Sequence, residues 1–232
     1  MAHFLILAAA SAIGQATASQ LRAAGHTVVT TARDRSRIDA DLLLDARDFD
    51  AVDRVVRDAG QLDGIVNCAG SLMLRAAHLT TRAQYDETIA ASLTTAFATV
   101  RAAGRHMTQG GSVVLISSAA ARTGLANHEA IAAAKAGIIG LTLSAAATYA
   151  GSGLRVNAIA PGLIASPLTA ALTGSETSLR VSEAMHALGR IGQPQDAARA
   201  IVFLLDPAND WITGQVLGVD GGLGSVRPKM KM

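Results

Sequence analysis

Small and polar residues follow several apolar runs of this 232-residue chain, and their types suit a phosphorylated cofactor. The first run leads into LAAASAIGQATA, where small side chains let the backbone approach a pyrophosphate and the next helix direct its N-terminus at it. Two alanines stand where glycines are more usual, and alanine disfavours a positive φ. The loop predicts a dinucleotide site, with an ordinary strand–turn–helix junction as the alternative. Its candidate residues are Ala8, Ser11, Ala12, Ile13 and Gly14.

Further candidate groups follow later apolar runs. The Asp45 carboxylate follows the third run, where it could accept a hydrogen bond from an adenine amino group. The motif NCAG ends the fourth run, and PGLI follows the sixth, where it could align backbone groups with a nicotinamide. In a parallel sheet these positions lie along one edge, at the carboxyl ends of the strands. The predicted contacts are Asp45, Asn67, Ala69, Gly70, Pro161, Gly162, Ile164 and Ser166.

The end of the second run, TTARDRSR, bears on the choice of cofactor. An acidic residue at the position of Ala32 would bind a ribose 2′-hydroxyl and select NAD. The chain instead continues with Arg33, Arg35 and Arg37, and a guanidinium pairs well with a 2′-phosphate. Asp34 weakens this interpretation, and a solvated charged loop is the alternative. We therefore expect NADP(H), with Arg33 as its contact, and keep NAD(H) as the second choice.

The elements that must position these groups alternate along the chain. Continuous apolar runs indicate strands covered on both faces, namely HFLILA, TVVTTA, ADLLLD, GIVNCA, SVVLISS, LRVNAIA and QVLGVD. Helical patterns lie between most of them, over Gln15–Ala24, Phe49–Ala59, Arg82–Met107, Ala130–Tyr149 and Gln195–Leu205. Only ARDRSRIDA joins the second and third runs, too little for a full crossover helix. We predict one Rossmann-like α/β domain over residues 1–232, doubly wound, with a mostly parallel sheet of about seven strands.

The composition excludes several function classes. A net charge of +2 and the absence of a dense basic run argue against a nucleic-acid partner. One cysteine, Cys68, and histidines without ligand spacing argue against a metal site and favour a reducing, cytoplasmic compartment. The apolar opening lacks a basic start, and the Ala-rich helix carries polar residues, so neither a signal peptide nor a membrane contact is expected.

The order and spacing of these motifs resemble the short-chain dehydrogenase/reductase family over Phe4–Leu223, through NCAG, Ser117-Ser118, the Lys135 helix, RVNAIAPG and ITGQVLGVDGG. The resemblance implies a serine that polarises the substrate oxygen, a tyrosine that transfers the proton, a lysine that binds the ribose, and an asparagine in a proton relay. Here the serine is Ser118 and the lysine is Lys135. Ile131 stands at the tyrosine position and Ser92 at the asparagine position. His128 is a candidate substitute acid, provided that its helix has begun, and a surface histidine is the alternative.

The resemblance leaves several functions open. The first is an NADP(H)-dependent oxidoreductase that transfers hydride to an activated C=C, C=N or carbonyl group. The second is a non-redox cyclase, isomerase or lyase with NADP as a scaffold, and the third is a silent subunit. An Ile131 introduced experimentally would also explain the sequence. The substrate would be a small molecule, covered by a lid over residues 166–192, with 224–232 as a tail. The family implies a homodimer or homotetramer, or a hetero-oligomer with a relative.

Overall fold

The computed structural model describes residues 1–227 and builds one seven-stranded sheet. The strands lie in the order β3-β2-β1-β4-β5-β6-β7, and every pair among them is parallel. The chain order reverses between β1 and β4, which creates the switch point where such sheets bind ligands. The doubly wound single domain predicted from the sequence is confirmed. The strands are β1 (His3–Leu7), β2 (Thr27–Ala32), β3 (Leu42–Leu43), β4 (Gly64–Asn67), β5 (Gly111–Ile116), β6 (Leu154–Pro161) and β7 (Val216–Val219).

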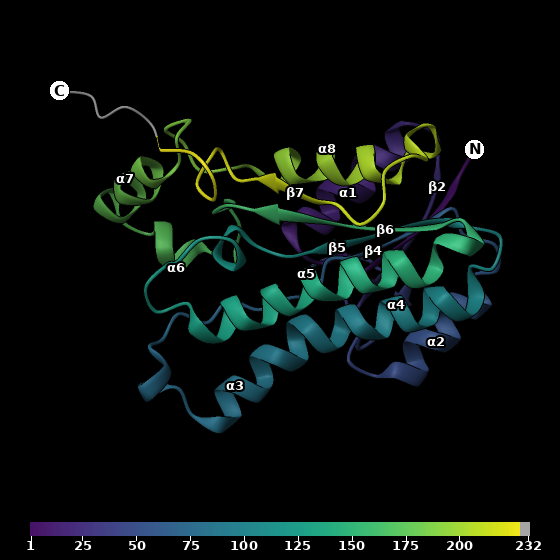
Figure 1. Cartoon of the computed structure of the whole chain (residues 1–232), viewed down its shortest axis with the longest axis horizontal. Coiled ribbons are helices and arrows are strands. Elements are labelled where there is room, and N and C mark those ends of the chain that lie inside the picture. Colours follow the sequence, from purple (N-terminus) through teal and green to yellow (C-terminus); the bar gives the residue numbers. More distant parts are fainter. Residues whose placement is uncertain (228–232) are drawn as a thin grey trace.

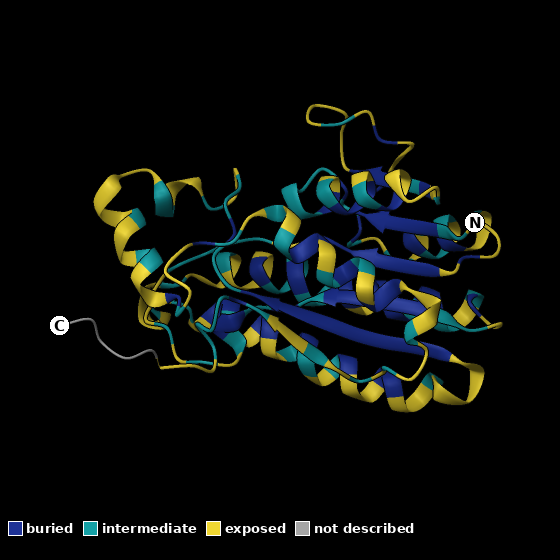
Figure 2. Cartoon of the chain, turned by 90° about the horizontal axis from the view of Figure 1, so that it is seen from above, coloured by how far each residue is buried: buried dark blue, intermediate teal, exposed yellow. Residues whose placement is uncertain are grey.

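Helices cover both faces of the sheet, with α1 and α8 above it and α2, α4 and α5 below it in Figure 1. Alternate residues of β1 divide between two cores: Leu5 and Leu7 pack on the α2, α4 and α5 side, and Phe4 and Ile6 on the α1 and α8 side. The central strands β1, β4, β5 and β6 are correspondingly largely buried in Figure 2. The helices are α1 (Ala12–Ala23), α2 (Phe49–Asp58), α3 (Arg82–Ile89), α4 (Thr95–His106), α5 (Glu129–Tyr149), α6 (Ala170–Thr173), α7 (Glu176–Met185) and α8 (Pro194–Leu205).

One predicted helix is divided and one predicted strand is shorter. The segment Arg82–Met107 forms α3, a π-helical turn, η2 (Ala90–Thr94), and then α4. The first residue of α4, Thr95, donates its hydroxyl back to the carbonyls of Ala91 and Ser92, so a polar side chain bonds to the backbone of the widened turn. The run ADLLLD pairs only through Leu42 and Leu43, at the sheet edge.

Residues 33–41, all described, contain no helix, as the short connection between the second and third runs predicted. In consequence Leu42 and Leu43 are 41% and 57% exposed. The predicted lid, 166–192, contains α6 and α7, two helices that the sequence patterns did not predict. Of the predicted tail, residues 228–232 lie outside the described part of the chain.

The Ala-rich helix behaves as a core helix. Glu129–Ser152 is long and apolar enough to cross a membrane by length and composition. It nevertheless packs along β6 and against α3 and α4, and buries polar side chains, Lys135 and Thr142, in those contacts. Of the apolar window of this helix, 44% is buried inside the protein. Short 3-10 turns complete the structure: η1 (Ala77–Leu79), η3 (Ala119–Ala121), η4 (Ala150–Ser152) and η5 (Pro207–Asn209).

Candidate active site

The loop between β1 and α1 has the backbone shape of a phosphate site. A Cβ on Gly14 would lie 2.8 Å from the Ala9 Cα, so glycine alone lets the helix approach the loop this closely. The Ser11 hydroxyl caps the helix by accepting from the Gly14 N–H at 3.0 Å. The N–H groups of Ala12 and Ile13, in the first turn, have no carbonyl partner inside the helix and suit an anion. The residues of this loop therefore fit a dinucleotide pyrophosphate.

Ala8 carries the conformational cost of the missing glycine. Its φ is +55°, one of two positive values at non-glycine residues among the described part of the chain. Its N–H donates to the Thr31 hydroxyl, and the Ala9 N–H donates to the Thr31 carbonyl, so β2 holds the turn in this shape. An L-residue in the left-handed region costs about 1–2 kcal/mol. The loop keeps the glycine geometry although it has lost the glycine.

Lys135 projects from α5 into the carboxyl edge of the sheet. Its side chain is buried, and Nζ donates to the Ile116 carbonyl at 2.8 Å. A Cβ on Gly70 would lie 3.3 Å from the same nitrogen, which brings NCAG and the lysine together. Burial lowers the pKa of Lys135 to about 8, and nearby Cys68 opposes the shift. Burial also raises the pKa of Cys68 to about 12, so this thiol stays protonated and inert.

The two serines that end β5 have different roles. The Ser117 hydroxyl is buried and donates to the Lys135 carbonyl at 2.8 Å, so it fixes α5 against the strand. The Ser118 hydroxyl accepts from the Ala120 N–H at 3.1 Å, as the cap of η3. Accepting this bond leaves the Ser118 proton free to be donated. Ser118 can therefore polarise a substrate oxygen, as the resemblance implies.

Ile131 and Ser92, at the positions where the resemblance implies a tyrosine and an asparagine, are both buried. Ile131 lies one turn before Lys135 on α5 and is 3% exposed, yet it belongs to neither large core cluster. Ser92 lies inside the π turn and is 1% exposed. Its hydroxyl has no hydrogen-bond partner among the described residues, which is costly for a buried polar atom. Neither side chain titrates, so among Ser92, Ile131 and Lys135 only the lysine is titratable.

His128 does not meet the condition on which its candidacy rested. The helix α5 begins at Glu129, and His128 precedes it with a φ of −106° and a ψ of 10°. It is the N-cap residue of α5, and its carbonyl accepts the first helical hydrogen bond from the Ala132 N–H at 2.7 Å. Its Nδ1 lies 2.7 Å from the Ala126 carbonyl, which fixes the ring against its own loop. Glu129 occupies the first turn, where its charge favours the helix dipole.

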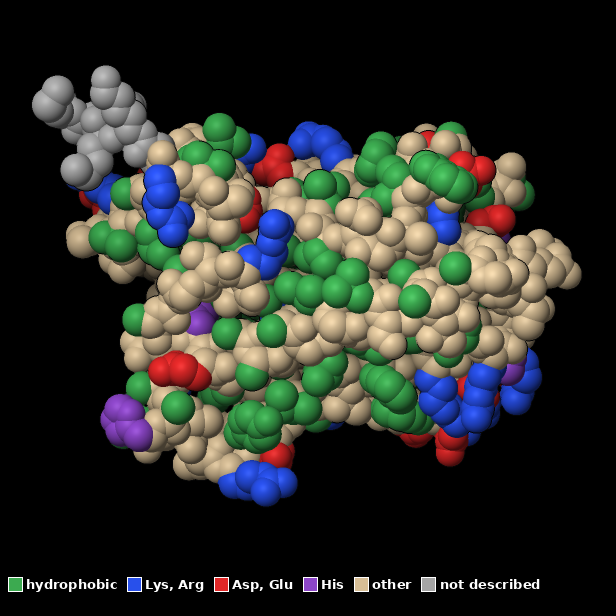
Figure 3. Space-filling model, in the orientation of Figure 1, with side chains coloured by type: hydrophobic (Ala, Val, Ile, Leu, Met, Phe, Trp, Pro, Cys, Tyr) green, Lys and Arg blue, Asp and Glu red, His purple; other side chains and the backbone are tan. Residues whose placement is uncertain are grey.

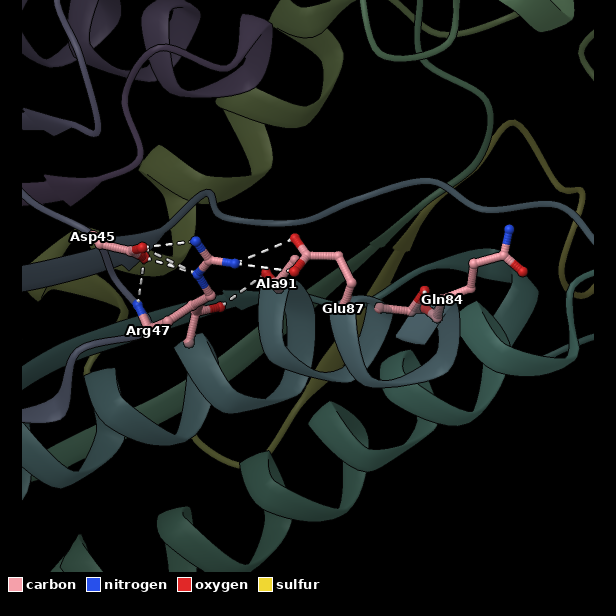
Figure 4. Close-up of polar contacts among 7 residues, drawn as sticks. Asp45, Arg47, Gln84, Glu87 and Ala91 are labelled. Carbon is pink, nitrogen blue, oxygen red and sulfur yellow. Dashed lines mark hydrogen bonds and ion pairs between the residues drawn. The ribbon is translucent and has the colours of Figure 1, made fainter. Parts of the chain in front are cut away.

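The predicted adenine contact lies in an ion-pair network that sequence patterns missed. Asp45 binds the Arg47 side chain through both oxygens, and Arg47 reaches on to Glu87 of α3 (Figure 4). The hydrogen bond from Arg47 lowers the pKa of Asp45 and so keeps it ionised. Arg33 lies close enough to contribute to this shift, and it forms no ion pair within the described chain. Arg33 is thus free for an anion, whereas Arg47 is not.

A buried histidine, also missed, supports the PGLI loop. The Leu163 N–H donates to His186 Nε2 at 3.2 Å, so Nδ1 carries the proton and donates to the Ser182 carbonyl at 2.7 Å. The same ring would meet a Cβ on Gly162 at 2.7 Å. His186 therefore joins the loop to α7. The adjoining cavity, about 550 Å³, is lined by Gly162, Leu163, His186 and Asp220, and not by Ser118 or Lys135.

The structure brings most of the predicted contacts to one edge. At the end of β4 the Asn67 side chain accepts from the Ala69 N–H at 2.8 Å, which shapes the turn before Gly70. Pro161 ends β6, and Ile164 bridges to Gly192 so that the PGLI loop is held on its far side as well. Ser166 and Thr169 bond to each other just beyond it. No group of three metal-ligating side chains occurs within residues 1–227.

Comparison with known proteins agrees with this arrangement. The family described as enoyl-(acyl carrier protein) reductase matches residues 7–224. The chain is 36% identical over 242 residues to cis-4-hydroxycyclohexanecarboxylate dehydrogenase of Sinomonas cyclohexanicum, covering 96% of each chain. It is 33% identical to the 3-oxoacyl-[acyl-carrier-protein] reductase FabG of Thermotoga maritima, covering 94% of this chain and 96% of that protein. The solved structure of ElxO with NADP bound has a TM-score of 0.89 and 28% identity, covering 97% of this chain and all of that one.

The chain therefore belongs to the short-chain dehydrogenase/reductase family. It is an NAD(P)-dependent oxidoreductase of that type, built on the fold that the sequence predicted.

Proposed function

We propose that this chain is an NADP(H)-dependent reductase for an activated C=C, C=N or carbonyl group that needs little acid assistance. The observation that carries the proposal is Ile131, which is buried one turn before Lys135 while Ser118 keeps a free hydroxyl proton. Binding, orientation and polarisation therefore remain, and the phenol of the family does not. When bound, the cofactor would supply the hydride.

The remaining groups suit a substrate whose negative charge is spread over several atoms. General acid–base catalysis typically contributes about 10²–10⁴-fold, so an unactivated ketone should react poorly here. Ser118 can donate one hydrogen bond to the reacting oxygen, and buried Lys135 adds a positive charge below its pKa of about 8. A conjugated enone or an iminium needs less acid assistance than an unactivated ketone, so these two groups could suffice. The description of the matching family as an enoyl reductase supports the C=C class.

The preference for NADP(H) rests on Arg33. This side chain follows β2 at the switch-point edge and has no ion-pair partner among the described residues. Arg35 pairs weakly with Asp39 instead, at 3.8 Å. Calorimetry should show tighter binding of NADP(H) than of NAD(H), and Arg33→Ala should remove the difference. Arg37→Ala in the same loop is the matched control, and equal affinities in the native protein would refute the preference.

The decisive experiment is an assay with stereospecifically deuterated NADPH against ketones, imines and conjugated enones. We expect deuterium in the enone or imine product and little in alcohols. His128→Ala should leave the rate unchanged, with His78→Ala as an exposed control. A loss of activity in His128→Ala alone, with cofactor affinity unchanged, would make His128 the acid. Transfer to no substrate class would favour a non-redox catalyst or a silent subunit, because neither transfers hydride from the cofactor.

We also propose a cytoplasmic homodimer or homotetramer. Apolar side chains spread over the face that carries α4 and α5 (Figure 3). Among them Phe97 of α4 is 50% exposed and Leu143 of α5 is 54% exposed. Small residues around them allow close packing of a second copy. Light scattering on the native protein and on Leu143→Glu tests this, and a native monomer would refute it; a co-purifying relative would indicate a hetero-oligomer.

A further inference from the structure

The Asp45 carboxylate, the candidate acceptor for the adenine amino group, is hydrogen-bonded to Arg47 through both of its oxygens. Its Oδ1 accepts from the Arg47 backbone N–H at 3.0 Å and from Nε at 3.1 Å. Its Oδ2 accepts from Nη2 at 2.8 Å. Nε also lies 3.1 Å from Oδ2, so its one hydrogen is shared between the two oxygens. A carboxylate has about four acceptor positions, and only three N–H donors occupy them here, so one further donor fits. The Asp45 side chain remains 42% exposed, and that donor could come from solvent.

The same guanidinium is held from its other end. Its Nη1 donates to both Glu87 oxygens, at 3.0 and 3.3 Å (Figure 4). Glu87 lies on α3, one turn before the π turn that contains Ser92. Arg47 thus spans from the end of β3 to the helix that leads into the catalytic edge. The Nε–Nη2 fork to Asp45 and the Nη1 contacts with Glu87 together restrain the orientation of the planar guanidinium more than one surface pair would.

We propose that Arg47 is a positioning residue that sets the selectivity of the site for adenine. Held between Asp45 and Glu87, it fixes the direction of the free Asp45 lone pair. That lone pair then accepts from a purine 6-amino group and opposes a 6-carbonyl oxygen. Glu87 acts one step further out, because it orients Arg47. This inference rests on the proposed use of NADP(H).

A merely structural role makes a different prediction. If the network only tied β3 to α3, its loss would lower stability and weaken all dinucleotides alike. If Arg47 acted only by its charge, Arg47→Lys would preserve binding and selectivity. If Arg47 instead blocked the adenine position by occupying Asp45, its removal would strengthen NADPH binding. Only if the guanidinium fork fixes the Asp45 geometry should the ratio of the dissociation constants for the adenine and hypoxanthine cofactors change in both Arg47→Ala and Arg47→Lys.

The test measures dissociation constants for NADPH, its hypoxanthine analogue and reduced nicotinamide mononucleotide, which has no base at that end. The native protein should prefer adenine over hypoxanthine about 10-fold, as expected for one charge-assisted hydrogen bond. Arg47→Ala and Arg47→Lys should both bring this ratio close to one, through weaker NADPH binding, and leave the mononucleotide unchanged. Glu87→Gln should lower the ratio about 3-fold, a smaller effect for the outer partner.

Arg82→Ala is the matched control. The Arg82–Asp86 ion pair lies on α3, as Glu87 does, but it does not include Asp45. It should leave every constant unchanged. An unchanged base ratio in both Arg47 variants, or tighter NADPH binding in Arg47→Ala, would overturn the inference alone. A native protein that binds no NADP(H) at all would overturn the proposed function as well, so the two failures are distinguishable.

Discussion

At each end of the proposed site one position holds a different residue from the one that the resemblance implies, and the local structures at the two positions differ. At the pyrophosphate end Ala8 replaces a glycine, yet the backbone keeps a φ of +55° and Gly14 keeps its close contact with Ala9. At the proton-donor end Ile131 stands where the resemblance implies a phenol, and its apolar side chain is buried. The loop at Ala8 thus keeps the backbone shape of the phosphate site, whereas Ile131 offers no exchangeable proton.

The difference follows from what each residue supplies. A glycine supplies backbone freedom, and neighbouring hydrogen bonds to Thr31 can enforce the same shape on alanine at a cost of about 1–2 kcal/mol. A phenol supplies an exchangeable proton, which no packing arrangement can restore. We therefore expect binding to be robust and proton transfer to be the weak step. Each experiment below breaks or sharpens this contrast.

The largest effect is expected for Lys135→Met. The change removes the buried cation that bonds to Ile116 and lies beside Gly70, on which both cofactor binding and polarisation would depend. Activity on the best substrate should fall at least about 10²-fold, with weaker NADPH binding. Steady-state kinetics and calorimetry measure the two effects. Full activity in this variant would show that the catalytic edge does not include Lys135.

The next effect is a gain in Ile131→Tyr. The phenol would stand one helical turn before Lys135, on a helix already fixed by the Ser117 bond to its backbone. Reduction of simple ketones should rise by about 10²-fold, the lower end of general acid catalysis. The control is Ile131→Phe, which adds the ring without the proton. Equal rates in the two variants would mean that the pocket has diverged beyond this residue.

Lys135 should also make stability depend on pH. Its pKa is about 8 in the folded state against 10.5 when unfolded, so between these values the unfolded chain holds more protons. Stability should therefore increase as pH rises from about 8 to 10.5, relative to Lys135→Met, by at most about 3 kcal/mol. Urea unfolding at several pH values measures it. Because the other lysines are Lys229 and Lys231, NMR can follow this titration directly.

A smaller loss is expected for Gly14→Ala. The new Cβ would approach the Ala9 Cα to 2.8 Å, and both atoms belong to the backbone frame of the loop. Overpacking of this kind costs about 1–3 kcal/mol. Gly140→Ala is the control, because nothing lies within 4 Å of its new Cβ on α5 and helix propensity should raise stability by about 1 kcal/mol. Similar effects in both variants would contradict a special role for Gly14.

The fold was predictable because its signals are continuous along the chain. Buried strands such as LRVNAIA show their apolar runs directly, and the missing helix after β2 followed from a count of residues. The lid helices were not predicted, since α7 buries none of its residues and so shows no apolar stripe. The π turn also escaped, because Ala90–Thr94 has the composition of any helix and its geometry depends on contacts with α5.

The site was predictable only where its residues stand in order along the chain. Ser118, Lys135 and NCAG occur at fixed spacings, so the sequence alone places them at one edge of the sheet. Arg47 and His186 could not be placed in this way, because their partners Glu87 and Leu163 lie 40 and 23 residues away. The strain at Ala8 follows from the preference of alanine for a negative φ, but the conformation that it adopts depends on the hydrogen bonds that the Ala8 and Ala9 N–H groups donate to Thr31.

The smallest effect and the sharpest test of the contrast is Ala8→Gly. Glycine adopts a positive φ without the steric cost of about 1–2 kcal/mol, but it loses about 0.4–1 kcal/mol through greater freedom of the unfolded chain. The net effect should be a gain of about 0.5–1 kcal/mol, the opposite of the usual result for alanine to glycine. Ala10→Gly, in the same loop at a position without positive φ, should instead lose stability.

Paired urea unfolding curves measure both changes, and calorimetry with NADPH follows the same variants. A stabilised Ala8→Gly with unchanged affinity would show that the loop already has its binding shape and only bears the strain. A destabilised Ala8→Gly would mean that alanine adopts this conformation without strain. The contrast between a strained loop at Ala8 and a missing proton donor at Ile131 would then no longer hold.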